Sequence, residues 1–501
     1  MNKILTPSEL TEKKIKKKVV LCHGVYDILH IGHIKHFEEA KKNGDILVVG
    51  VTTSKFINKG PNRPYFKLNQ RAEAIASLSV VDYVVISDFP TSVEIIKKIK
   101  PDYYCKGIDF KDISKDLTTN IKKEISAIKS VGGKFITTKS SKLSSTRIFK
   151  DNFESENKLE KEFLSRVRRK YTFKDVQNIF TKLNTLKGIV IGEAMIDQYS
   201  FCEPVNKSGK DPMLVFKDLF LKSYLGGSLA IANHISRFIK KVSILTSIGD
   251  KSKFKKFIID NLSKNINLKL ISKSNSDTIL KKRYIDFITN TKVFGLYKID
   301  ERKFDQKHET KFQNTINNSI KKFNFVILSD YGHGLISDKV AKIITKKSNF
   351  LIVNCQINSF NVGYHRLSKY KNFDCLIANE NELRSDSREQ YLEIEKLIIR
   401  RSEDLKVNFL IVTRGKDGAI FYSRKNKSFY YAPAFTKIAL DKIGAGDTMM
   451  ALLAPLLYLK LDPDFILLVA SLAGSYSVGN YANSKTLDKH KILKDLQHIL
   501  D

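Results

Sequence analysis

Residues 440–448 decide the fold of the longer part of the chain and read Leu440-Asp441-Lys442-Ile443-Gly444-Ala445-Gly446-Asp447-Thr448. A long apolar run follows, which predicts a buried helix with Asp447 near its N-terminus. The two glycines let backbone N–H groups approach an anion without a Cβ in the way, and the helix end adds partial positive charge. A carboxylate there can accept the proton of an attacking hydroxyl while the N–H groups stabilise a migrating phosphoryl group. The stretch therefore predicts phosphoryl transfer with Asp447 as the base; a glycine turn before a buried helix is the alternative.

Two earlier stretches, residues 378–382 (ANENE) and 410–418 (LIVTRGKDG), lie at the ends of apolar runs. Together with residues 440–448 they resemble the ribokinase-like (PfkB) sugar kinases. The resemblance implies ATP as the phosphoryl donor and a Mg²⁺ ion that Glu382 holds through water, beside Asn379. It implies ATP contacts from Asn379, Glu382, Thr413, Gly415, Gly418, Gly444, Ala445 and Gly446.

The sequence also contains candidate residues for binding the sugar in this predicted kinase. Asp197 follows the first strand of the region, and a carboxylate there can accept hydrogen bonds from adjacent sugar hydroxyls. A helix-capping turn is the alternative for Asp197. Gly226, Gly227 and Asn233 match the first glycine signature of the family and are expected at the sugar. Residues 208–212 lie where a lid hairpin would contact the sugar or form a dimer.

Two positions depart from the family pattern. His333 stands where the family often has a lysine, and Lys442 stands where a threonine is usual. The first substitution leaves a role in phosphate binding open. The second weakens the expectation of a monovalent-cation site.

Short apolar runs alternate with helical patterns in both parts of the chain. Strands are predicted at residues 19–22, 46–51, 83–86, 103–105 and 134–137. From residue 187 the rhythm resumes, with runs at 188–193, 195–197, 242–248, 325–329, 350–354, 375–378 and 409–413. This alternation predicts an α/β protein with two doubly wound parallel-sheet domains.

The first predicted strand runs into a histidine motif, His23-Gly24-Val25-Tyr26-Asp27-Ile28-Leu29-His30-Ile31-Gly32-His33. His30 and His33 can present ring N–H groups to one triphosphate, Gly32 allows close approach, and the helix end favours the anion. A metal site is the alternative, because His23, His30, His33 and His36 are four of the ten histidines. The sequence suggests no matching cysteine or carboxylate cluster, so phosphate binding is the favoured interpretation.

This motif resembles the G-x-F-D-x-x-H-x-G-H signature of the cytidylyltransferase-like nucleotidyltransferases, with tyrosine at the phenylalanine position. Residues 58–64, the helix containing Arg71, residues 106–110 and residues 143–148 match further parts of that family in order. The resemblance implies a Rossmann-like domain in which His30, His33 and the triphosphate lysine Lys59 are catalytic. It implies nucleotide contacts from Gly24, Tyr26, Asp27, Gly32, Arg71, Lys106, Asp109, Ser144, Ser145 and Thr146. Lys139 replaces an arginine of several cytidylyl-type members, which leaves the donor open between ATP and CTP.

Composition bounds the remaining possibilities. A chain of 501 residues with 42% hydrophobic content can form two or three domains with buried cores. The net charge of +34 comes from lysines spread over the whole length, which favours compositional bias over a nucleic-acid interface. Five distant cysteines without a C-x-x-C pair predict neither a disulfide framework nor a zinc knuckle. No export signal or membrane span is expected, and the cytoplasm is the predicted compartment.

Residues 151–182 are charged, poor in glycine and proline, and carry apolar residues at loosely helical spacing. We predict a helical linker at 156–184 between a nucleotidyltransferase domain, residues 1–155, and a kinase domain, residues 185–501. A contact helix for a partner subunit and a solvated connector both fit the pattern.

Nearly the whole chain resembles the bifunctional heptose kinase/adenylyltransferases of lipopolysaccharide precursor synthesis, with the two domains in reversed order. The resemblance implies an enzyme that phosphorylates a sugar or sugar phosphate with ATP and Mg²⁺. It would then transfer a nucleotidyl group to a sugar 1-phosphate and release pyrophosphate. The alternatives are a transferase for another phosphorylated alcohol, such as glycerol 3-phosphate, and a nucleic-acid-binding protein on decayed enzyme domains. Sugars and nucleotides are the expected partners, without a specific nucleic acid, and a homodimer is left open.

Overall fold

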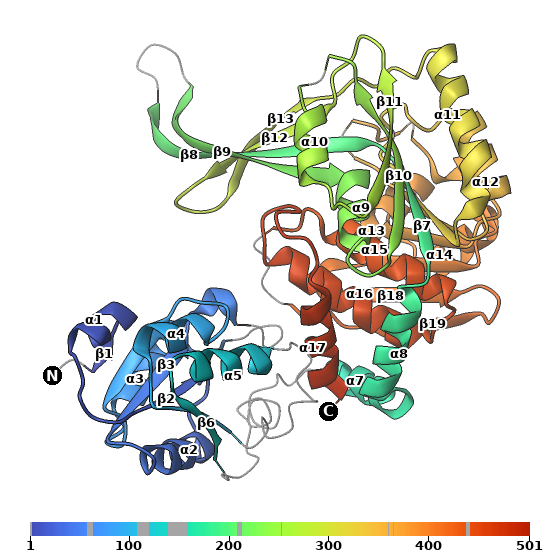
Figure 1. The fold of residues 1–501 in the computed structure, drawn as a ribbon. Coiled ribbons are helices and arrows are strands. Elements are labelled where there is room, and N and C mark those ends of the chain that lie inside the picture. The colour runs from blue at the N-terminus through green and yellow to red at the C-terminus, as the bar shows by residue number, and fades with distance from the viewer. Residues whose placement is uncertain are drawn as a thin grey trace. The chain divides into compact units, whose positions relative to one another are not determined.

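The computed structural model describes residues 3–57, 64–107, 120–138, 158–207, 213–251, 253–358, 360–363, 365–436 and 441–500 (Figure 1). The chain forms two compact units, Met1–Asn157 and Lys158–Asp501. Each unit has its own parallel sheet and its own buried core.

The described part of the first unit is built on one six-stranded parallel sheet, with strand order β1-β4-β3-β2-β5-β6. All five strands predicted for this region are present, and among its described strands only the two-residue β1 was not predicted. The neighbours of β2 are β3 on one side and β5 on the other, so the strand order reverses there, and ligands of such sheets bind beyond the carboxyl ends at this point. The strands are β1 (Ile4–Leu5), β2 (Val19–Gly24), β3 (Ile46–Thr52), β4 (Tyr83–Ser87), β5 (Tyr103–Lys106) and β6 (Lys134–Thr137).

Helices cover both faces of this sheet. Phe37 of α2 and Ile75 of α3 pack on one face, and Leu10 of α1, Ile96 of α4 and Ile128 of α5 pack on the other. The predicted doubly wound arrangement is therefore confirmed for this unit. The helices are α1 (Pro7–Glu12), α2 (Ile31–Lys41), α3 (Leu68–Ala76), α4 (Val93–Ile99) and α5 (Asn120–Ser130).

The second unit contains a large sheet whose described strands follow the order β11-β10-β7-β14-β15-β16-β17-β18-β19. Neighbouring strands are parallel from β11 to β17 and antiparallel beyond it. The predicted runs at 188–193, 242–248, 325–329, 350–354, 375–378 and 409–413 are strands of this sheet, so its parallel core is confirmed. The strands are β7 (Lys187–Gly192), β10 (Lys241–Gly249), β11 (Ile266–Lys273), β14 (Phe325–Asp330), β15 (Leu351–Cys355), β16 (Cys375–Asn379), β17 (Phe409–Thr413), β18 (Ala419–Ser423) and β19 (Ser428–Ala432).

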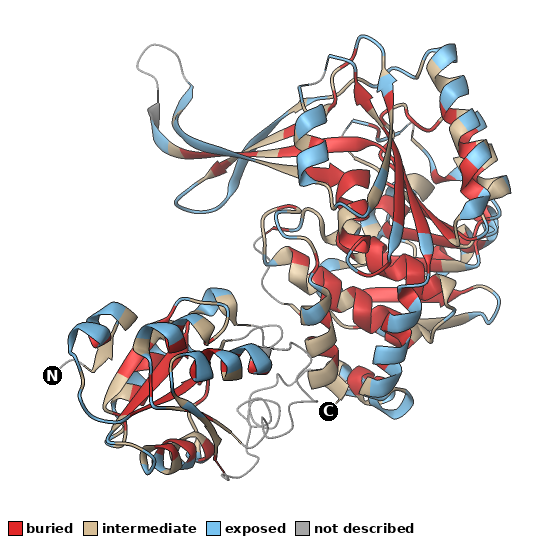
Figure 2. Ribbon diagram, in the orientation of Figure 1, coloured by how far each residue is buried: buried red, intermediate tan, exposed pale blue. Residues whose placement is uncertain are grey.

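A second, four-stranded sheet of this unit has the order β13-β12-β8-β9, and we call it the lid sheet. It consists of β8 (Ala194–Lys207), β9 (Leu214–Gly227), β12 (Ile279–Asp286) and β13 (Lys292–Lys298). Its extent was not predicted; the run at 195–197 is the beginning of β8 rather than a strand of the large sheet. Figure 2 shows the outer part of β8 and β9 largely exposed, whereas central strands of the large sheet such as β14 are buried.

Helices also cover both faces of the large sheet. One core includes α15 and α16, and the other includes α11, α12 and α14. The helices of the unit are α7 (Lys158–Lys170), α8 (Phe173–Leu183), α9 (Ser228–Ile235), α10 (Lys255–Asn261), α11 (Gln306–Ser319), α12 (Asp338–Lys347), α13 (Glu380–Ser387), α14 (Ile394–Leu405), α15 (Ala445–Tyr458), α16 (Pro463–Val478) and α17 (Lys489–Leu500). Within the described residues, no helix is both long and apolar enough to cross a membrane.

The predicted linker requires a correction. Residues 158–183 are helical, as α7 and α8, but both helices are part of the second unit. Phe163 and Phe180 are buried in its core, and the ring of Tyr171 stacks on that of Phe465 at 4.6 Å between centroids. Arg166 of α7 pairs with Asp464 of α16 at 3.3 Å. Apolar burial and ion pairing therefore make these helices a layer of the kinase unit rather than a connector.

Candidate active sites

Asp447 lies in the first turn of α15, as predicted, and two side chains fix its carboxylate. The hydroxyl of Tyr331 donates to Oδ1 at 2.8 Å, and Nδ2 of Asn483 donates to Oδ2 at 3.3 Å. Burial raises the pKa of Asp447 to about 6, the negative charge of Asp197 acts in the same direction, and the two hydrogen bonds oppose the rise. A carboxylate with a pKa just below neutrality is well suited to accept a proton from a hydroxyl.

The glycines before Asp447 have different roles. Gly444 caps the helix with φ +86°, and a Cβ there would lie 2.5 Å from Oδ1 of Asn483. Gly446 is exposed, and a Cβ there would meet nothing within 4 Å. Gly444 thus allows Asn483 to reach the base, while the helix N-terminus at Ala445 and Gly446 is open toward an incoming phosphate.

Asp197 lies on β8 and is buried, with 3% of its surface exposed. Nη1 of Arg283, on the adjacent strand β12, contacts its Oδ1 at 2.5 Å. A Cβ on Gly226 would come within 2.3 Å of its Oδ2, so that glycine provides the space for the carboxylate. Gly227, with φ +56°, caps α9 next to it. Asp197 therefore belongs to a strand and not to a helix-capping turn, and Arg283 is a partner that sequence reasoning missed.

The prediction for Asn233 is corrected by its contacts. Its Nδ2 donates to the carbonyl of Asn261 at 2.9 Å, and its Oδ1 accepts from the amide of Ser263 at 2.9 Å. Both ends of the amide are thus used to join α9 to the segment after α10. We assign Asn233 to the fold rather than to the sugar site.

Asp441, six residues before the base, is 2% exposed and accepts four hydrogen bonds. Tyr199 Oη and Lys292 Nζ each lie at 2.5 Å, and the amides of Ile443 and Ala482 each lie at 3.0 Å. Burial raises the pKa of Asp441, but these donors outweigh it and the net shift is downward. Because Tyr199 and Lys292 belong to the lid sheet, Asp441 ties that sheet to the loop before α15.

Asn379 and Glu382 form a reciprocal capping box at the start of α13, with both hydrogen bonds at 2.8 Å. Burial raises the pKa of Glu382 to about 7. The box uses Oε2 of Glu382, and within the described residues no hydrogen bond to Oε1 is found. A Mg²⁺-bound water at Oε1 fits this donor set and would favour the ionised carboxylate.

The turn after β17 carries the other predicted ATP contacts, Thr413, Gly415 and Gly418. Gly415 has φ +58° and open space where a Cβ would lie, so its backbone is accessible to a nucleotide. Gly418 has φ +82°, and a Cβ there would lie 2.0 Å from the carbonyl oxygen of Ala432. The packing of β18 on β19 therefore requires glycine at position 418. This requirement explains the residue whether or not it contacts ATP.

In the first unit, His30 caps α2, and its Nδ1 accepts from the amide of Gly32 at 3.1 Å. In the neutral ring this places the proton on Nε2, which gives a donor for phosphate. The rings of His30 and His33 stack at 3.9 Å between centroids. Tyr26 has a backbone φ of +48°. Its ring meets the His33 ring edge-on, with 5.2 Å between the centroids, and fills the space next to Gly24. Tyr26 supports the histidine pair from the buried side.

Arg71 was predicted to contact the nucleotide; its Nε and Nη1 bond within the fold, whereas Nη2 has no hydrogen-bond partner among the described residues. Arg71 is 2% exposed and donates to the carbonyls of Phe66 at 3.1 Å, Val25 at 2.7 Å and Thr52 at 3.0 Å. Asp27, 1% exposed, accepts from the amide of Phe66 at 3.0 Å. Arg71 and Asp27 therefore fix the loops around the histidine motif from within.

Lys106 lies at the end of β5, on the other side of β2. Its Nζ donates to the carbonyl of His23 at 3.3 Å and pairs with the buried Glu124 at 3.6 Å. Burial, assisted by the charge of Lys106, lowers the pKa of His23 to about 3, so that ring is neutral. The remaining predicted residues of this site lie outside the described residues: Lys59, Asp109, Lys139, Ser144, Ser145 and Thr146.

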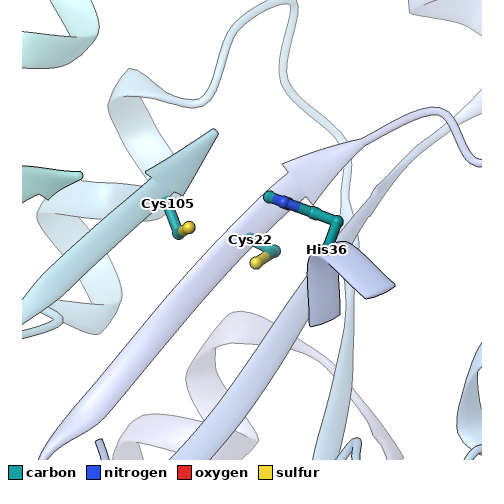
Figure 3. A group of neighbouring side chains, drawn as sticks. All are labelled: Cys22, His36 and Cys105. Atoms are coloured by element: carbon teal, nitrogen blue, oxygen red, sulfur yellow. The ribbon is translucent and has the colours of Figure 1, made fainter. Parts of the chain in front are cut away.

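Two of the five cysteines lie closer together than their wide spacing in the sequence suggested. Cys22 and Cys105 lie opposite each other on β2 and β5, and His36 of α2 approaches them so that one ligand atom of each lies within 4.8 Å of the others (Figure 3). His36 Nδ1 also contacts Thr138 Oγ1 at 2.8 Å. Among the described residues, neither this group nor the one formed by Asp330, Cys355 and His365 includes His30 or His33. The metal interpretation of that histidine pair gains no support.

The two sites define a phosphotransferase of ribokinase-like fold joined to a Rossmann-like nucleotidyltransferase domain. Residues 186–489 match the pfkB family carbohydrate kinases, and residues 21–151 match the cytidylyltransferase-like family. The chain belongs to the pfkB family of carbohydrate kinases and carries a cytidylyltransferase-like nucleotidyltransferase domain before it.

The relatives of the N-terminal region include two bacterial proteins named Bifunctional protein HldE. The protein of Campylobacter concisus is 42% identical over 131 residues, which is 26% of this chain and 28% of the relative. The protein of Nitratiruptor sp. is 42% identical over 123 residues, which is 24% of this chain and 26% of the relative. These alignments span only about a quarter of the relatives' length.

Solved structures resemble the kinase unit in fold alone. Phosphofructokinase-2 from Escherichia coli, in complex with potassium, has a TM-score of 0.51 at 11% identity and covers 63% of this chain and 99% of its own. Ribokinase of Arabidopsis thaliana, complexed with ribose and ATP, has a TM-score of 0.50 at 18% identity and covers 62% and 99%. Both similarities agree with the predicted ribokinase-like architecture.

Proposed function

We propose that the chain catalyses two steps toward a nucleotide-activated sugar of the heptose type, for use in a surface polysaccharide. In the first step, Asp447 takes the proton of a sugar hydroxyl, whose oxygen forms a bond to the γ-phosphorus of ATP as ADP leaves. In the second, an oxygen of a sugar 1-phosphate attacks the α-phosphorus of ATP or CTP, and pyrophosphate leaves. His30 and His33 stabilise the charge on the triphosphate.

The observation that carries the kinase step is the orientation of Asp447. Its carboxylate is held by Tyr331 and Asn483 at the N-terminus of α15, with its pKa raised to about 6. The buried pair of Asp197 and Arg283 lies close enough for Asp197 to influence the base, so a sugar hydroxyl bound at Asp197 would lie near Asp447. Mg²⁺ would bind through water at Glu382 and neutralise the charge of the ATP phosphates.

The heptose assignment is supported by the similarity of the N-terminal region to proteins named HldE. The cytoplasm, where nucleoside triphosphates are made and thiols stay reduced, is the proposed compartment. A homodimer through the lid sheet is supported by the exposed apolar side chains Leu221, Phe294 and Leu296, which are 48%, 49% and 62% exposed.

The test is a panel of sugars and sugar phosphates against ATP and CTP, with ADP and pyrophosphate measured separately. We expect ADP from ATP with one sugar or sugar phosphate, and pyrophosphate only when a sugar 1-phosphate is present. Pyrophosphate release with glycerol 3-phosphate instead would assign another phosphorylated alcohol to the first unit. Absence of turnover together with salt-sensitive RNA retention would overturn both enzymatic assignments.

A further inference from the structure

Lys281 carries a buried positive charge close to the base. It lies on β12 of the lid sheet, in register with Asp197 on β8, and is 8% exposed. Its Nζ lies 5.6 Å from the ring centroid of Tyr331, whose hydroxyl donates to Asp447. Within the described residues, no hydrogen bond or ion pair to this Nζ is found. The cation–π contact with Tyr331 offsets part of the cost of burying this ammonium, which is left able to bind an anion.

Unlike Lys281, the neighbouring cations each form an ion pair with a carboxylate. Arg283, two residues further along β12, contacts Asp197 at 2.5 Å, and Lys292 contacts Asp441 at 2.5 Å. Lys273 pairs with Asp300 at 3.5 Å. Each of these cations has a carboxylate partner, so the open charge of Lys281 is a local property and not a general shortage of acids.

Several charged groups face Lys281. Burial lowers its pKa, and the charge of Arg283 acts in the same direction, whereas Asp197, Asp447 and Glu193 raise it. Lys281 in turn lowers the pKa of Asp447. The ammonium thus lies near both Asp197, the predicted sugar ligand, and Asp447, the predicted base. The phosphoryl group must pass through this region during transfer.

His333, in the loop after β14, lies near Lys281 and carries no charge of its own. It is 3% exposed, and within the described residues neither ring nitrogen has a hydrogen-bond partner. Burial lowers the pKa of His333 to about 3, and the charge of Lys281 adds to this effect. Its backbone amide and that of Tyr331 donate to Glu193 at 3.2 Å and 3.0 Å, which fixes the loop.

We propose that Lys281 is a catalytic residue of the kinase unit that contacts the phosphoryl group during its transfer and supplies the positive charge that His333 lacks. The proposal rests on the kinase reaction proposed above. The sugar oxygen forms a bond to the γ-phosphorus, the bond from that phosphorus to the bridging oxygen breaks, and ADP keeps the electron pair. The proton goes to Asp447, while Lys281 remains protonated and offsets charge on the equatorial oxygens.

A phosphate already present on the sugar would offer the same dianion to Lys281, so the experiment must separate the two sources. The variants are Lys281→Met, Lys281→Arg and, as the matched control, Lys282→Met. Lys282 is the next residue of the same strand and lies over the ring of Tyr284 at 4.7 Å. ADP formation is measured with the best substrate of the panel, in its free and phosphorylated forms, together with a melting curve of each variant.

For Lys281→Met we expect a loss of about 10²- to 10³-fold in kcat with little change in KM, because the lost contact stabilises the transition state. The acidic limb of its pH profile should move upward, and Lys281→Arg should recover part of the rate. The melting temperature should stay equal or rise, because an unpaired buried charge has been removed. A rise in KM confined to the phosphorylated substrate would place the bound phosphate on the sugar instead of on ATP and would overturn the proposed role in phosphoryl transfer.

The result that overturns the proposal outright is a Lys281→Met enzyme whose kcat and KM stay within twofold of those of wild type. Failure of the proposed function looks different, since wild-type protein would then form no ADP with any sugar of the panel. Lys282→Met should match wild type in every measurement.

Discussion

Each unit places its predicted reactive residues at the N-terminal end of a helix, yet the residues differ in kind. The start of α15 carries Asp447, with a pKa raised to about 6. The start of α2 carries His30 and His33, whose rings stack beside a glycine amide. A helix end provides a site for an anion in both cases, and the side chain determines which chemical step follows. A hydroxyl nucleophile needs a base, whereas a sugar phosphate is already an anion and needs donors on the leaving triphosphate.

The largest effect is expected for Asp447→Asn, which keeps the volume of the side chain and removes the base. ADP formation should fall about 10²- to 10⁴-fold. Pyrophosphate release from a sugar 1-phosphate should not change, because that site lies in the other unit. ADP formation within a few-fold of wild type would show that another group is the base.

The complementary changes are His30→Ala and His33→Ala. Each should lower pyrophosphate release by about 10²- to 10³-fold, the usual cost of losing one preorganised donor, and leave ADP formation unchanged. Metal analysis and melting curves provide the control. If the pair held a metal, both variants would lose bound metal and the first unit would unfold.

A smaller effect is expected from the hydroxyl of Tyr331. Kinase kcat/KM should be constant at neutral pH and should fall as the pH drops below about 6, because Asp447 must be ionised to accept a proton. Tyr331→Phe removes a hydrogen bond that lowers the pKa of Asp447, so the acidic limb should move upward by about one pH unit. If the acidic limb is unchanged in Tyr331→Phe, a group other than Asp447 is responsible for it.

The smallest effect concerns Asn233, assigned here to the fold. Asn233→Ala removes its bonds to Asn261 and Ser263 and should lower the free energy of unfolding by about 1–2 kcal/mol without changing KM for the sugar. Denaturant unfolding and steady-state kinetics on the same sample measure both quantities. A several-fold rise in KM with unchanged stability would restore Asn233 to the sugar site.

The sequence predicts the parts of this protein that depend on local pattern. The buried strands of both sheets follow from short apolar runs, and the start of α15 follows from Gly444 and Gly446 before a long apolar run. The place of Asp447 in the first turn of α15 was predictable because neighbours in the chain set its distance from the helix end.

What the sequence did not predict depends on register and tertiary contact. Cys22 and Cys105 are 83 positions apart, and only the pairing of β2 with β5 brings them together. The lid sheet depends on pairing β8 with β12, which also places Lys281 opposite Asp197. The composition of α7 and α8 fits a solvated helix equally well until their apolar faces meet the core of the kinase unit.

The central proposal, that both units act on the way to one nucleotide-activated sugar, is tested most directly by nucleotide-sugar formation in the full-length Asp447→Asn protein. With free sugar and nucleoside triphosphates this variant should make no nucleotide sugar. With the corresponding sugar 1-phosphate it should make the product at the wild-type rate, with either ATP or CTP as donor. The contradicting result is a folded variant that turns over no sugar 1-phosphate with either nucleotide while wild type forms ADP, because the two units would then serve unrelated substrates.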